Sequence, residues 1–157
     1  MTDDKKKEFQ RRLAACNSSG MIVIEFDIFF EYLNDANANI EMGGEPFKDA
    51  IRHADAVLKR LQDTLDFKYD IATKLFPLYG YARQQLMIAM ATKKAKPISN
   101  ANNVIRKIYD AFAKIAENDD SPPIMSNTQS VYAGVTYGKG SLNEGIGNMD
   151  GSRGFLA

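Results

Sequence analysis

Apolar residues recur in steps of three and four through the first 117 residues of this chain, and this spacing restricts the fold more than any other feature. The most regular series is Phe47, Ile51, Ala54, Leu58, Leu61 and Leu65. Steps of three and four place side chains on one face of an α-helix, whereas a half-buried strand has apolar residues at every second position. The series therefore predicts an all-α fold.

The same spacing predicts helices in five places. They cover residues 3–15, 21–36, 45–66, 70–91 and, after a cap at Ser99, about 100–117. The core-facing series of the last helix is Ala101, Ile105, Ile108, Phe112 and Ile115. Four long amphipathic helices joined by short loops favour an antiparallel four-helix bundle. Residues 3–15 are expected to add a short N-terminal helix to this bundle.

The glycines are distributed unevenly. Seven of the eleven lie between Gly134 and Gly154, beside Asn and Ser and few large aliphatic residues. Such a segment buries too little apolar surface to offset the entropy lost when it becomes ordered. We therefore expect a helical bundle domain over residues 1–117 and a flexible Gly/Asn/Ser-rich tail over residues 118–157.

The charge balance and the short apolar runs argue against nucleic acid and membranes as partners. Lys and Arg together number 20, as do Asp and Glu, so no strong basic field attracts nucleic acid or an anionic membrane. The longest apolar run, residues 21–24, is too short to cross a bilayer, and the first residues lack the apolar core of a secretory signal. A single cysteine, Cys16, suits a reducing compartment. We expect a cytoplasmic protein without nucleic acid or membrane insertion.

Residues that typically carry catalysis or bind metals are few. Cys16 has no histidine near it in the sequence, and one histidine, His53, permits no His-rich metal cluster. We therefore expect no enzyme activity, no metal and no cofactor. A histidine phosphotransfer bundle uses one exposed histidine on a helix, so His53 leaves that function open as a minor alternative.

Two of the predicted helices have more apolar surface than a single neighbour covers. The core-facing series of the helix over residues 70–91 is Ile71, Leu75, Leu78, Ala82, Leu86 and Ala89. At about 100° per residue, Phe76, Gly80 and Met87 lie on the opposite side, and Gly80 leaves a notch there. The apolar arc over residues 21–36 is about 200° wide. Either a partner helix binds these faces, or the chain covers them with its N-terminal helix and with a central position for residues 21–36.

Residues in these helices resemble the FliS family of flagellar export chaperones. They are Leu65-Asp66, Ala72, Leu75, Leu78-Tyr79, Tyr81, Leu86 and Ala89, followed by a Lys-rich loop and a last amphipathic helix. Residues 18–27 are similar to the capped start of an aliphatic stretch with an aromatic-Asp pair in that family. The resemblance covers about residues 17–117.

The resemblance implies a helical bundle that binds the C-terminal helical region of flagellin in the cytoplasm. Such a protein prevents premature polymerisation of flagellin and delivers it to the flagellar type III export apparatus, with export gate components as further partners. By matched position, the resemblance implies protein binding by Ile22, Phe26, Phe29, Phe30, Phe76, Tyr79, Gly80 and Met87. A generic interaction or adaptor bundle is the alternative.

Overall fold

The computed structural model describes residues 1–125, which form helices and loops and contain no strand. The helices are α1 (Asp3–Ala15), α2 (Ser18–Asn39), α3 (Glu45–Asp63), α4 (Asp70–Thr92) and α5 (Ala95–Glu117). The predicted all-α fold is confirmed. None of the described helices is long and apolar enough to cross a membrane.

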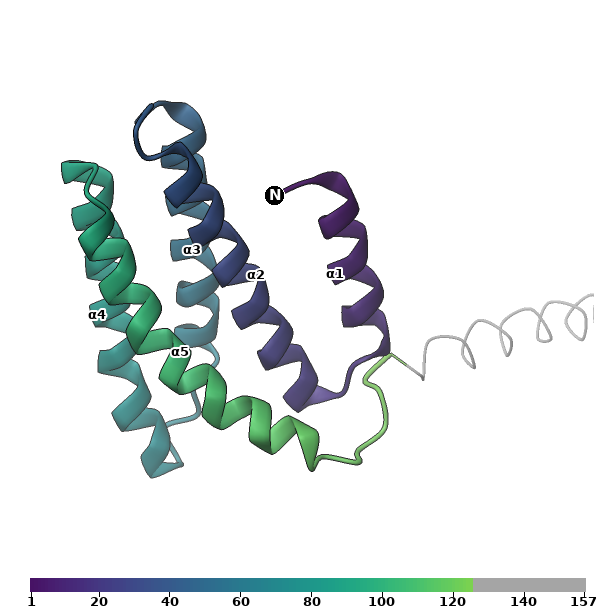
Figure 1. Ribbon diagram of the computed structural model, residues 1–157. Helices are drawn as coiled ribbons and strands as arrows, with labels where there is room; N and C mark the ends of the chain where they lie inside the picture. Colours follow the sequence, from purple (N-terminus) through teal and green to yellow (C-terminus); the bar gives the residue numbers. More distant parts are fainter. Residues whose placement is uncertain (126–157) are drawn as a thin grey trace, which may run out of the picture.

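Helices α2 to α5 form a four-helix bundle (Figure 1). Both α2 and α4 pack against α3 and α5, so the four helices close a ring around one core. The short helix α1 packs against α2, on the side away from α4 (Figure 1). The predicted bundle with an additional N-terminal helix is therefore confirmed.

Aromatic side chains of three helices meet at the centre of the bundle. Phe26 of α2 is completely buried, and its ring lies 6.4 Å from the ring of Tyr79 on α4, measured between centroids. On α5, Tyr109 and Phe112 approach the same ring to 6.2 and 5.8 Å. Such aromatic pairs add about 0.5–1.5 kcal/mol each beyond the apolar area that they bury. This cluster fixes the position of α2 relative to α4 and α5.

The apolar series of α3 lies in the core, as its spacing predicts. Phe47, Ile51, Ala54 and Leu58 are completely buried. They face α2 on one side and α4 on the other, because α3 packs against both helices. The regular steps of three and four were sufficient to identify this face.

The start of the last helix differs from the prediction. α5 begins at Ala95 rather than after a cap at Ser99, so Pro97 is the third residue of the helix. A proline is tolerated there because the first N–H groups of a helix have no carbonyl partner within it. Pro97 and Ile98 are both buried, so the additional turn also extends the core.

Helix α4 continues through Pro77. Proline has no N–H group, so the carbonyl of Thr73 loses its partner within the helix. Both Thr73 and Pro77 lie on the exposed side of α4. Water can therefore satisfy the free carbonyl, which explains why a proline is compatible with the middle of this helix.

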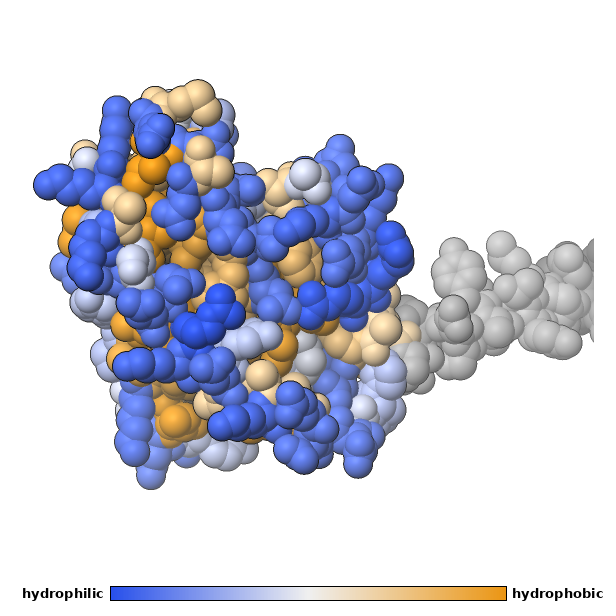
Figure 2. Space-filling model, in the orientation of Figure 1, coloured by the Kyte–Doolittle hydropathy of each residue, from blue (hydrophilic) through white to orange (hydrophobic). Residues whose placement is uncertain are grey.

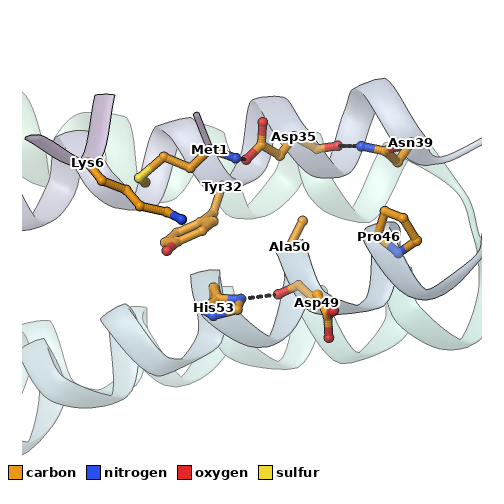
Figure 3. Close-up of a pocket in the computed structure, with 9 residues that line it drawn as sticks. All are labelled: Met1, Lys6, Tyr32, Asp35, Asn39, Pro46, Asp49, Ala50 and His53. Atoms are coloured by element: carbon orange, nitrogen blue, oxygen red, sulfur yellow. Dashed lines mark hydrogen bonds and ion pairs between the residues drawn. The ribbon is translucent and has the colours of Figure 1, made fainter. Parts of the chain in front are cut away.

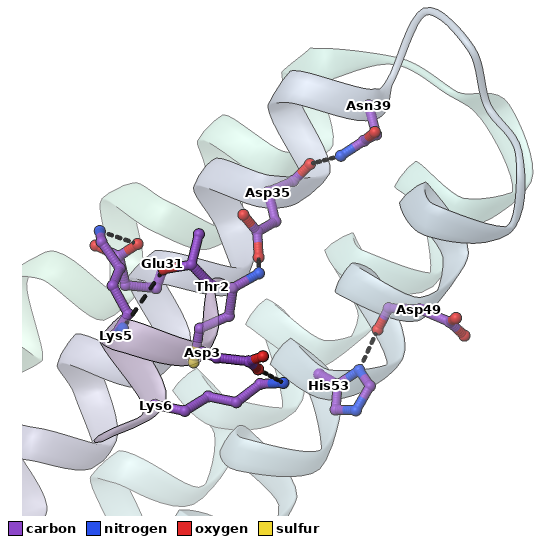
Figure 4. A network of polar contacts seen from close by, with 10 residues as sticks. Thr2, Asp3, Lys5, Lys6, Glu31, Asp35, Asn39, Asp49 and His53 are labelled. Carbon is purple, nitrogen blue, oxygen red and sulfur yellow. Dashed lines mark hydrogen bonds and ion pairs between the residues drawn. The ribbon is translucent and has the colours of Figure 1, made fainter. Parts of the chain in front are cut away.

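Ion pairs connect α1 to α2. Lys5 lies 2.5 Å from Glu31 (Figure 4), and Arg12 lies 2.5 Å from Asp27. Phe9 is the buried residue of α1. One buried side chain and partly exposed ion pairs stabilise a helix much less than a continuous apolar face does. We therefore expect α1 to detach more readily than the four bundle helices.

The residues that follow α5 contact the junction of α1 and α2. The side-chain amide of Asn17 donates to the carbonyl of Asp119 (2.8 Å), and the N–H of Ile124 donates to the carbonyl of Cys16 (3.0 Å). Hydrogen bonds from Ser121 and Ser19 lower the pKa of Asp119. Of the predicted tail, residues 118–125 therefore hold a defined position, and residues 126–157 lie outside the described residues.

Replacing Phe9 with alanine should release α1 and leave the bundle folded. Burying a phenylalanine contributes about 1.5–3 kcal/mol, and this contribution acts on α1 alone. Hydrogen exchange measured by mass spectrometry should become at least about tenfold faster in α1 and change little in α2 to α5.

The control is Phe26→Ala, which removes the centre of the aromatic cluster and should destabilise the whole bundle by about 3–5 kcal/mol. If Phe9→Ala accelerated hydrogen exchange equally in all five helices, α1 would not detach separately from the bundle.

Candidate protein-binding site

The apolar surface of α2 is covered within the chain. α2 packs against α1, α3 and α5, and its residues Phe26, Phe29 and Leu33 are almost completely buried. Of the two explanations for its wide apolar arc, the central buried position is therefore the one that the structure favours.

Helix α4, in contrast, packs against two helices and keeps large apolar side chains exposed. These are Ile71, Phe76, Leu78, Tyr81, Met87 and Ile88. α1 does not cover them, since it lies on the far side of α2 (Figure 1). In Figure 2, hydrophobic surface is visible over the part of the molecule that α4 and α5 form, at the left, whereas the α1 side is mostly hydrophilic. The surplus apolar surface of the described residues is thus concentrated on α4.

An apolar groove of about 430 Å³ lies between α4 and α5. We call it the α4–α5 groove; its lining residues are Ile71, Leu75, Leu78, Val104, Lys107, Ile108, Ala111, Phe112 and Ile115. Lys107 is the one ionisable residue among them. A concave surface with so little charge suits the apolar face of an amphipathic helix.

A second hollow, which we call the end pocket, adjoins the α4–α5 groove at the start of α4. It measures about 280 Å³ and shares Ile71, Leu75 and Phe112 with the groove. Ile22 of α2 and Tyr79 of α4 also line it. The groove and the end pocket together form one continuous and mostly apolar surface around the start of α4, with Asp66 as the ionisable carboxylate in the lining of the end pocket.

The eight binding residues that the resemblance implied occupy three different places. Ile22 and Tyr79 meet in the end pocket, although Tyr79 is only 1% exposed. Burial, and to a smaller extent the charge of Glu25, raises the pKa of Tyr79 and keeps its phenol neutral. This pair is therefore the part of the implied set that lies on the continuous apolar surface.

The other implied residues do not lie with this pair. Phe26, Phe29 and Phe30 lie in the core. Gly80 lies beside Gln62 of α3, and Phe76 and Met87 are exposed on α4.

The notch at Gly80 is closed on one side by α3. A Cβ atom added to Gly80 would lie 3.8 Å from Nε2 of Gln62, and that nitrogen donates to the carbonyl of Phe76 (3.1 Å). Arg83 donates to Oε1 of Gln62 (3.1 Å) and to both carboxylate oxygens of Asp55 (2.7 and 3.1 Å). The bond to Asp55 raises the pKa of Arg83. Polar contacts therefore close the α3 side of α4.

Ile71, Leu78 and Ile115 were predicted to face the core, and this prediction is wrong. Their exposed fractions are 57%, 40% and 56%. α4 and α5 diverge towards the start of α4 and the end of α5 (Figure 1), so apolar residues there lack a neighbour on one side. Helical spacing identifies the apolar face of a helix, but not how far its neighbour extends along that face.

A polar pocket of about 280 Å³ lies between α1, α2 and α3 around His53 (Figure 3). The ring of His53 stacks on Tyr32 at 4.9 Å, and its Nδ1 donates to the carbonyl of Asp49 (2.7 Å). The side chain of Asn39 donates to the carbonyl of Asp35 (2.7 Å). These polar groups are therefore engaged with each other. No group of three potential metal ligands occurs among residues 1–125.

The comparison with known families agrees with this geometry. The family described as "FliS: Flagellar protein FliS" matches residues 1–119 of the chain. The chain belongs to the FliS family. FliS proteins are flagellar export chaperones and not enzymes, so this FliS chain is assigned to the assembly of the flagellum. Among curated proteins, no sequence matches it.

Replacing Gly80 with alanine should stabilise this FliS chain by about 0.5–1 kcal/mol, because glycine in a helix interior costs about that much relative to alanine. The new methyl group would make an ordinary contact with Gln62. Urea denaturation measures the change. A loss of stability would mean that α3 and α4 pack too closely at Gly80 to accept a side chain.

Proposed function

We propose that this FliS chain binds the C-terminal helical region of flagellin in the cytoplasm, prevents its premature polymerisation and delivers it to the flagellar type III export apparatus. The observation that carries the proposal is the open apolar surface formed by the α4–α5 groove and the end pocket. The family supports the role in flagellar export, and the groove supplies a surface on which a helical ligand can bind.

The chemistry of the α4–α5 groove favours a helical apolar ligand. Its walls present side chains from two helices, and Lys107 is its one charged residue. An amphipathic helix binds such a groove through apolar residues spaced three and four apart. When a ligand that is unfolded in solution folds on the groove, its own apolar face becomes covered and no longer drives association between ligand molecules.

The eight residues that the resemblance implied have different roles in this proposal. Ile22 contacts the ligand in the end pocket, and the buried Tyr79 forms part of the wall of that pocket. Phe76 and Met87 stay exposed on α4 and form a second contact for a ligand that continues around this helix, with Gly80 between them in the sequence. Phe26, Phe29 and Phe30 act from the core by holding α2 and α5 in place. Export gate components remain further proposed partners.

Two other functions follow less directly from the structure. A generic adaptor bundle would also use an apolar groove, but the match to the FliS family favours an export chaperone. A phosphotransfer bundle would depend on His53, whose ring stacks on Tyr32 and whose Nδ1 is hydrogen-bonded. We therefore retain the export chaperone as the proposed function.

Aspartate at Leu78 or Ile115 should weaken binding of a flagellin C-terminal segment at least tenfold. Both side chains line the groove and are 40% and 56% exposed, so the variants should fold, but the bound ligand would bury an unpaired carboxylate. Titration calorimetry measures the affinity, and tenfold corresponds to about 1.4 kcal/mol.

The matched control is Met42→Asp. Met42 is an exposed apolar residue in the loop between α2 and α3, and it does not line the groove. The Met42→Asp variant should bind the flagellin segment with the same affinity as the unchanged protein. If all three variants bound equally well, the groove would not be the binding site.

Wild-type binding should also show a negative heat capacity change, because a ligand that folds on the groove removes much apolar surface from water. Calorimetry at several temperatures gives this quantity. A heat capacity change near zero would contradict coupled folding on an apolar surface.

A further inference from the structure

Another hollow lies on the other flank of α5, between α2 and α5. It is polar, whereas the α4–α5 groove is apolar. It measures about 390 Å³. α2 contributes Asn34 and Asn37 to its lining, and α5 contributes Ser99, Asn102 and Arg106. No acidic residue lines it. Its one charge is therefore the guanidinium of Arg106, surrounded by neutral groups that both donate and accept hydrogen bonds.

Aromatic rings hold the guanidinium of Arg106 in place. Its Cζ lies 3.7 Å from the centroid of the Phe30 ring and 5.5 Å from that of Tyr109. Stacking on a ring fixes the plane of a guanidinium and leaves its N–H groups free around the edge of that plane. Phe30 is itself 8% exposed, so a rigid part of the core supports this side chain.

The donors of Arg106 have no acceptor among residues 1–125. Arg12, Arg60 and Arg83 each donate to a carboxylate of this chain, whereas Arg106 makes no hydrogen bond or ion pair with another described residue. Arg106 is exposed, and its planar, stacked guanidinium can donate to the two oxygens of a carboxylate. The hollow thus has the composition of a carboxylate-binding site.

We propose that this hollow binds the carboxylate of an acidic side chain, with Arg106 donating two parallel hydrogen bonds. Asn34, Asn37 and Asn102 would bind the peptide groups beside that side chain, since an amide donates and accepts as a peptide group does. The carboxylate chemistry follows from the hollow itself. That the carboxylate belongs to the exported polypeptide rests on the proposed function.

The position of Arg106 lets one ligand occupy both surfaces. At about 100° per residue, Val104 and Arg106 fall on opposite flanks of the buried face of α5, and Val104 lines the α4–α5 groove. A polypeptide that crosses the exposed face of α5 would therefore place apolar residues on one side and an acidic residue on the other. The ion pair would fix the register in which the apolar residues bind.

The carboxylate site can be tested without flagellin. The arginine Nε–H signals of the full ¹⁵N-labelled chain are followed by NMR during titration with N-acetyl-glutamate N-methylamide. Arg106 should show a saturable shift that the matching glutamine compound does not cause. Arg11 is the internal control, because it is exposed and makes no hydrogen bond or ion pair with another described residue. Similar responses of Arg106 and Arg11 to both compounds would overturn the proposal.

The Arg106→Lys variant separates charge from geometry. Lysine keeps the charge but loses the planar fork and the stacking on Phe30. In a chain whose unfolding midpoint is unchanged, the three asparagine side-chain signals should no longer respond to the glutamate compound. An unchanged response would mean that Arg106 does not form the site.

The source of the carboxylate is tested with the flagellin C-terminal segment. Arg106→Gln should raise the dissociation constant about tenfold at low salt, as expected for a lost bidentate ion pair, and should reduce its dependence on salt. Arg11→Gln removes the same charge outside the hollow and should change neither. If Arg106→Gln binds normally while Leu78→Asp does not, the carboxylate does not come from this ligand. If the unchanged chain binds no flagellin, the proposed function fails, and the NMR titration alone decides whether the hollow binds carboxylates.

Discussion

The burial of Phe26 against Tyr79, Tyr109 and Phe112 determines how the apolar surface of this chain is distributed. It holds α2 at the centre, where α1, α3 and α5 cover the wide apolar arc of that helix. α4 then packs against two helices and retains apolar side chains that the described residues leave exposed. α4 therefore keeps exposed apolar side chains, which form the candidate binding surface, because α2 and not α4 occupies the central position.

Polar contacts decide which flank of α4 is open. On the α3 side, Gln62, Arg83 and Asp55 form a hydrogen-bonded network that closes around Gly80. On the α5 side, the groove has Lys107 as its one ionisable residue. A buried polar network is satisfied only by specific partners, whereas an apolar groove accepts many apolar faces. The two flanks of α4 therefore differ in what they can bind, although the sequence places apolar residues on both of them.

The helices and most of the core follow from local spacing. Phe47 to Leu61 recur at helical intervals and are all buried, because α3 has neighbours along its whole length. Spacing also identified α4 as a helix with surplus apolar surface. It could not identify the open part of that surface, because exposure at Ile71 and Leu78 depends on the divergence of α5. That divergence is set by tertiary packing and not by either helix alone.

The implied binding residues illustrate the same limit. Phe26, Phe29 and Phe30 were matched by position to a ligand-binding role, yet these side chains form the core. A large aromatic residue on an apolar helix suits a core and a binding surface equally well. Arg106 was not singled out at all, since nothing in its local sequence shows that it stacks on Phe30, a residue 76 positions earlier in the chain.

The central claim is that the α4–α5 groove is the surface on which flagellin binds. A photo-crosslinking residue placed in turn at Leu78, Ile115 and Met42 tests this claim most directly, with the attached flagellin peptides identified by mass spectrometry. The account predicts crosslinks from Leu78 and Ile115 to the C-terminal helical region of flagellin and none from Met42. Crosslinks from Met42, with none from the two groove positions, would contradict it.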